Sequence, residues 1–102
     1  MPAVPATSFV LVATLVVRRA KLAEFHAFEQ RAAAIMRRYG GEILEALFVD
    51  TDPSSESVRE LHVISFPDRP AFDTYRVDPE LLSLGALRER AIASTTVRIW
   101  PG

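Results

Sequence analysis

The segment Phe9 to Val17, FVLVATLVV, is a nearly unbroken apolar run rich in β-branched residues, and it decides the fold. Its length and composition predict a central strand of a sheet. A strand with one face in water should alternate apolar and polar residues. Here apolar residues fill both faces, with Phe9, Leu11, Ala13 and Leu15 on one and Val10, Val12 and Val16 on the other. Both faces must be covered, and the helices of one chain suffice for only one of them. We therefore expect a second molecule or a bound ligand on the other face.

Length and composition limit the possible classes of protein. The chain has 102 residues, enough for one domain that buries roughly 60 to 70% of its unfolded surface. We expect residues 1–7 to form a flexible arm and residues 8–102 to form the single domain. The formal net charge of -1 argues against partners such as nucleic acid or an anionic membrane. Without cysteine, the chain has no disulfide, no thiolate nucleophile and no thiolate metal site.

The apolar run could be mistaken for a targeting segment. No basic residues precede it, and Arg18 and Arg19 follow where a signal peptide would have a small-residue cleavage site. Its 9 residues are too few to cross a bilayer as a helix. The sequence thus predicts a soluble cytoplasmic protein that does not bind membranes.

The rest of the chain alternates helical and strand patterns. Ala20 to Tyr39 has apolar residues at helical spacing, and Gly40 can end this helix in the left-handed conformation. The patterns predict strands at Glu42 to Val49, Val58 to Phe66 and Ser94 to Trp100, with two helical pieces at Ala71 to Val77 and Pro79 to Ala93. The order β-α-β-β-α-β is an α+β, ferredoxin-like arrangement with a four-stranded antiparallel sheet.

Glu60 and His62 are the strongest candidates for catalytic residues. They lie two apart on one predicted strand, hence on one face, with roughly 7 Å between their Cα atoms. His62 could move a proton near neutral pH while Glu60 orients or charges it. In the alternative interpretation, His62 is a hydrogen-bonded core or interface residue and Glu60 lies at the solvated start of the strand.

Four further residues are candidates for ligand binding in the same cavity. Arg98 could bind a carboxylate or oxyanion, and Thr14 could add a polar group to the lining. Tyr75 and Trp100 could form an aromatic wall. The alternatives are an edge-strand role for Arg98, in solvent or across a dimer, and simple packing for the two aromatic residues.

No metal or cofactor is predicted. His26 has Glu29 and Gln30 one helical turn away, but two ligands from one helix do not make a metal site, and His62 is the only other histidine. The pair Gly40 and Gly41 follows a helix instead of opening one, so it is not a phosphate-binding loop.

Several motifs together resemble the dimeric α/β barrel superfamily, and within it most closely the bacterial domain-of-unknown-function 1330 family. The resemblance covers about residues 8 to 100 and rests on Arg38-Tyr39-Gly40-Gly41, Phe66-Pro67-Asp68, Ala71-Phe72, Tyr75, Asp78-Pro79 and the helix containing Arg88. It implies a homodimer in which two ferredoxin-like sheets pack face to face, often with a cavity in each half.

Superfamily members include cofactor-free monooxygenases, lactone isomerases, haem enzymes and proteins without assigned activity, and the fold does not choose among them. The chain contains no asparagine, so the asparagine-dependent sites of several relatives have no counterpart. We expect a homodimer that binds a small organic molecule, with cofactor-free proton-transfer or oxygenase-type chemistry at His62, assisted by Glu60 and Arg98. The alternatives are a non-catalytic dimerisation or binding module and, third, a haem enzyme.

Overall fold

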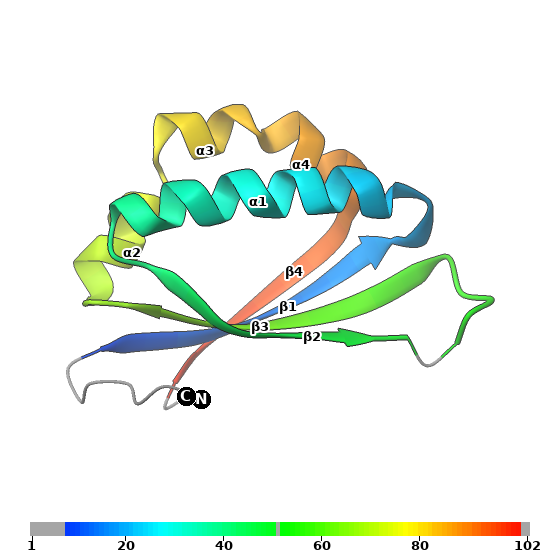
Figure 1. Ribbon diagram of the computed structural model, residues 1–102, viewed down its shortest axis with the longest axis horizontal. Helices are drawn as coiled ribbons and strands as arrows, with labels where there is room; N and C mark the ends of the chain where they lie inside the picture. The colour runs from blue at the N-terminus through cyan, green and yellow to red at the C-terminus, as the bar shows by residue number, and fades with distance from the viewer. Residues whose placement is uncertain (1–7, 51, 101–102) are drawn as a thin grey trace.

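The computed structural model describes residues 8–50 and 52–100, so the expected arm at residues 1–7 lies outside the described residues. Figure 1 shows one sheet with its helices. The elements in chain order are β1 (Phe9–Arg18), a short 3-10 helix (Arg19–Lys21), α1 (Leu22–Arg38), β2 (Glu42–Val49), β3 (Ser57–Phe66), α2 (Arg69–Tyr75), α3 (Pro79–Ser83), α4 (Gly85–Ala91) and β4 (Ile92–Trp100). The predicted ferredoxin-like α+β arrangement is confirmed.

The sheet has the strand order β2-β3-β1-β4, with every neighbouring pair antiparallel. The apolar segment Phe9 to Val17 forms β1, which is a central strand, as predicted. Two connections cross over the sheet: α1 joins β1 to β2, and the segment α2 to α4 joins β3 to β4. Connections between parallel strands of one sheet are nearly always right-handed. Both of these crossovers therefore lie on the same side of the sheet. All helices accordingly lie over one face, the covered face, and the other is the open face (Figure 1).

The last helical region differs from the prediction. A single piece from Pro79 to Ala93 was expected, but α3 ends at Ser83 and α4 ends at Ala91. The chain changes to strand at Ile92, which pairs with Val17 of β1 and is only 5% exposed. The prediction that the helix continues to Ala93 is wrong, because Ile92 begins β4, where it pairs with Val17 and packs into the core.

The core lies between the covered face and the helices, in two clusters. One cluster contains Leu15, Val17, Phe25, Val58, Ala91 and Ile92. The other contains Leu11, Ala13, Met36, Ile64 and Phe66. Packing is tight where α1 turns into β2: a Cβ built on Gly41 would lie 2.5 Å from Cε1 of Phe66 and would also overlap Met36. A glycine is therefore required there.

The open face has no helix over it among the described residues (Figure 1). Val10, Val12 and Val16 of β1 lie there together with Leu61 and Val63 of β3, and all five are only half-buried. The sequence prediction of a strand that is apolar on both faces is thus confirmed, and one chain covers only one of them. In the part of the chain that the structure describes, no helix is long and apolar enough to cross a membrane.

Candidate functional site

Glu60 and His62 project from β3 toward the helices. The register explains this placement, because they pair with Leu15 and Ala13 of β1, both on the covered face. Glu60 is 7% exposed and His62 is 5% exposed. Nε2 of His62 lies 2.9 Å from Oε1 of Glu60. The expected shared face is confirmed, and Glu60 is not at a solvated strand start.

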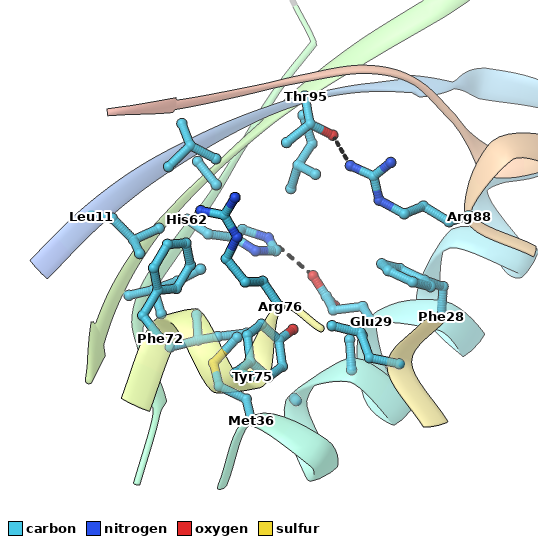
Figure 2. A pocket seen from close by; sticks show the side chains of 18 of the residues that line it. Leu11, Phe28, Glu29, Met36, His62, Phe72, Tyr75, Arg76, Arg88 and Thr95 are labelled. Atoms are coloured by element: carbon cyan, nitrogen blue, oxygen red, sulfur yellow. Dashed lines mark hydrogen bonds and ion pairs between the residues drawn. The ribbon is translucent and has the colours of Figure 1, made fainter. Parts of the chain in front are cut away.

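A third residue, Glu29, joins them from α1. Its Oε2 lies 3.0 Å from the same Nε2 of His62 (Figure 2). Only the contact with Glu60 has hydrogen-bond geometry, and Oε2 of Glu29 is buried without a hydrogen-bond donor among the described residues. One Nε2 proton cannot serve two carboxylates equally well, so this cluster has two acceptors competing for one donor.

Competition for this proton changes the pKa of each group. Burial disfavours the charged form of His62, but its close contacts with the carboxyl groups of Glu29 and Glu60 outweigh this effect and raise its pKa above the usual 6.5. Contact with His62 lowers the pKa of Glu29, against a smaller opposing effect of burial. Burial raises the pKa of Glu60, only partly countered by His62. The pKa shifts therefore favour the charged form of His62 and the ionised form of Glu29, and they favour the protonated form of Glu60.

A cavity of about 760 Å³ lies in front of this cluster, between the covered face and the helices. Most of its lining is apolar and includes Leu11, Phe28, Met36, Ile64, Phe66 and Phe72. His62 and Glu29 line the cavity (Figure 2), whereas Glu60 is not part of the lining. A large apolar cavity with a few convergent polar groups is the usual form of a small-molecule site.

The four predicted ligand-binding residues separate onto the two faces. Tyr75 lines the cavity, and its burial raises the pKa of its hydroxyl to about 12. Arg98 pairs with Val12, Trp100 pairs with Val10, and Thr14 lies on the same strand face as these valines. Arg98, Thr14 and Trp100 are therefore on the open face. The expectation that they share one cavity with His62 is wrong within a single chain, because strand register places them on the far side of the sheet.

Glu29 was not among the predicted site residues, although the sequence holds a signal for it. The buried stripe of α1 includes Phe25, Ala32 and Met36, and Glu29 lies four, three and seven residues from them. It is therefore a carboxylate inside an apolar helical stripe. Its partner on β3 is more than 30 residues away in sequence, and only the fold brings the two together.

The same three residues could also hold a cation. The possible ligand atoms of Glu29, Glu60 and His62 lie within 4.8 Å of one another, the one such group found among the described residues. His26, the other histidine, is exposed on α1 and does not belong to it. One imidazole and two carboxylates suit several divalent ions, so metal dependence needs a direct test.

Comparison with known proteins supports the fold. SnoaB, a cofactor-independent oxygenase from Streptomyces nogalater, matches with a TM-score of 0.65 and 20% identity over 93% of this chain and 92% of that chain. A candidate antibiotic biosynthesis monooxygenase from Nitrosomonas europaea matches with a TM-score of 0.70 and 12% identity, over 99% and 95%. A protein of unknown function from Rhodopseudomonas palustris has a TM-score of 0.73 and 16% identity, over 94% and 83%.

The sequence itself matches no protein-family model, and no curated protein matches it. The resemblance to the domain-of-unknown-function 1330 family is therefore not confirmed. What the similar structures establish is architecture: the chain shares its ferredoxin-like fold with a cofactor-independent oxygenase and with a candidate antibiotic biosynthesis monooxygenase.

Proposed function

We propose that this chain is a single-domain cytoplasmic protein that binds a small organic molecule in the cavity and transfers a proton to or from it. The observation that carries the proposal is the placement of His62, buried between two glutamates and facing an apolar cavity of about 760 Å³. Buried titratable groups with shifted pKa values, gathered at a cavity, are typical of catalytic sites.

The roles follow from the arrangement of the three groups. Glu29 reaches the cavity as the ionised carboxylate, so it can accept a proton from an acidic C–H or O–H bond of the ligand. His62, whose charged form the two glutamates favour, can stabilise the negative oxygen that results or return a proton to it. Glu60 contacts His62 and orients its ring. Tyr75 forms part of the cavity wall.

Oxygenase-type chemistry is the more specific form of this proposal. It is supported by the likeness of the fold to SnoaB, a cofactor-independent oxygenase. In an oxygenation without a cofactor, the substrate must itself supply the electrons that reduce dioxygen. Removal of a proton makes the substrate a better electron donor, and a carboxylate in an apolar cavity suits that first step.

We also propose that the protein is a homodimer joined through the open face. The support is the row of half-buried apolar residues on β1 and β3, which no described element covers. Thr14, Arg98 and Trp100 lie on this face, and we assign them to the interface or to a pocket that the second copy completes. Twofold dimers are the commonest assembly of soluble proteins, and a sheet face of this kind is self-complementary.

The test is a comparison of two histidine variants. A panel of phenols and enolisable ketones would be screened for ligand binding, proton exchange with solvent and oxygen uptake, before and after treatment with a chelator. For any substrate found, we expect His62→Gln to lower kcat/KM at least about a hundredfold. His26→Gln changes an exposed histidine of α1 and should leave the rate unchanged. Thermal unfolding of both variants would show whether the fold is retained.

Other outcomes would contradict the proposal. A folded His62→Gln variant with full activity would remove His62 from the chemistry. If no ligand bound and both variants changed stability alone, the chain would be a non-catalytic dimerisation or binding module. Loss of activity with the chelator, restored by a divalent metal, would show that Glu29, Glu60 and His62 hold a cation in place of sharing a proton.

A further inference from the structure

Arginine side chains are concentrated at the mouth of the cavity. Arg69 is the first residue of α2, Arg76 directly follows the end of that helix and Arg88 lies in α4, and all three belong to the lining. In Figure 2, Arg76 and Arg88 reach from their helices into the space in front of the His62 and Glu29 pair. Against these three cations the lining has only two carboxylates, Glu29 and Glu89. Glu29 is already engaged with His62, so positive charge is in excess at the mouth.

Asp73, a carboxylate outside the lining, does not remove this excess. Asp73 lies 3.6 Å from Nε of Arg69 and 3.8 Å from Nη1 of Arg76, so one carboxylate is shared between two guanidinium groups. Both distances exceed that of a good hydrogen bond, and the side chains are about half exposed. Such contacts neutralise charge only weakly.

The positive charge of Arg88 is neutralised even less than those of Arg69 and Arg76. Its Nη2 donates a 2.7 Å hydrogen bond to Oγ1 of Thr95 on β4, a neutral hydroxyl. Among the described residues, no carboxylate lies within ion-pair distance of its guanidinium group. The bond to Thr95 instead holds the side chain across the cavity, between α4 and the sheet. The other N–H donors of the Arg88 guanidinium group remain for another acceptor.

We infer that the ligand of this cavity is an organic anion, with an apolar or aromatic body inside the cavity and an acidic group at the mouth between Arg76 and Arg88. The inference rests on the proposed function, because it concerns the ligand of the same cavity. Two guanidinium groups that lack full carboxylate partners match the planar oxygens of a carboxylate or the oxygens of a sulfonate. The apolar lining contributes affinity for the body through burial.

Two fluorescent probes with the same ring skeleton test this inference. Anilinonaphthalene sulfonate is anionic, and phenylnaphthylamine is its neutral parent without the sulfonate. Fluorescence titration of the intact protein should give a Kd about tenfold lower for the sulfonate. The double variant R76Q/R88Q should lose this preference and still bind the neutral probe. Added salt should weaken the binding of the sulfonate and leave that of the neutral probe unchanged, because ions screen exposed charges.

Matched variants locate the effect. Arg90→Gln removes an exposed arginine of α4 that does not line the cavity, two residues from Arg88, and should keep the preference. Val97 lines the cavity and its side chain is 47% exposed, so Val97→Trp should narrow the cavity and weaken the binding of both probes. Equal affinity of the two probes, or a preference that survives in R76Q/R88Q, would overturn the inference and leave the cavity proposal intact. If Val97→Trp weakened neither probe, the cavity proposal would fail, and this inference with it.

Discussion

The two faces of β1 are both apolar in sequence, but their environments in the structure differ. On β1, Leu11 and Val17 of the covered face are 2% and 0% exposed. Val10, Val12 and Val16, which alternate with the covered-face residues, are only half-buried. The difference arises from the two crossovers, which have the same hand and therefore place α1 and the later helices on one side. Apolar residues on both faces of a strand thus indicate that both faces are packed against other elements. In a single chain, helices pack against only one of these faces.

The polar residues of the two faces differ in the same way. Glu60 and His62 on the covered face are buried and satisfy each other, with Glu29 added from α1. Thr14 and Arg98 on the open face have no such enclosure. A buried ionisable group must find a partner or change its protonation state, whereas an exposed one need not. The covered face is therefore where the chain shows the features of a chemical site.

The largest effect is expected from a charge placed on the open face. Val12→Glu would put an unpaired carboxylate into the proposed dimer interface, and we expect the dimer dissociation constant to rise by more than about a hundredfold. Analytical ultracentrifugation over a range of concentrations measures this constant. Ser54→Glu adds the same charge in an exposed turn and should leave it unchanged. A native chain that is monomeric, or a Val12→Glu variant that still dimerises, would show that the open face is not the interface.

The second prediction concerns packing on the covered side. In Gly41→Ala, the new methyl group would overlap Phe66 and Met36, and overpacking of this kind should lower the free energy of unfolding by about 2 kcal/mol. Gly85→Ala is the matched control, because a Cβ there meets nothing within 4 Å, and its effect should stay within about 0.5 kcal/mol. Urea unfolding of both variants decides the point. Equal losses in the two would mean that the junction of α1 and β2 is not tightly packed.

The smallest expected effect is a change of stability with pH. The folded-state pKa of His62 is raised above 6.5 by Glu29 and Glu60, so its stabilisation is complete below pH 6.5 and is lost as pH rises through the folded value. Glu29 acts oppositely: its lowered pKa stabilises the fold above pH 4.5, and this contribution is lost as pH falls. We therefore expect Tm to decline above pH 6.5.

The measurement is Tm against pH for the native chain and two variants. His62→Gln should flatten the decline above pH 6.5, and His26→Gln should preserve it. An unchanged slope in His62→Gln would mean that other groups, and not the imidazole between the two glutamates, cause the pH dependence.

Much of the fold was predictable from local patterns. The apolar runs predicted all four strands, and β2 has the predicted bounds, Glu42–Val49. Asp68 and Asp78 cap α2 and α3 as their types suggest, accepting hydrogen bonds from the backbone N–H of Ala71 and Glu80. The end of α4 was not predictable in this way, because Ile92 could extend a helix as well as begin a strand. Its pairing with Val17 decided between them.

The candidate site was only half predictable. The two-residue alternation of a strand puts Glu60 and His62 on one face, so this pair, the helical stripes and the need to cover both sides of β1 follow from the order of the residues alone. Three features depend on how the chain folds: which face the helices cover, the contact of Glu29 with His62, and the position of Arg98 on the opposite side of the sheet from Tyr75. The reason is physical: periodicity relates residues within one element, whereas contacts between distant elements depend on strand register and crossover hand, to which residues far apart in sequence contribute together.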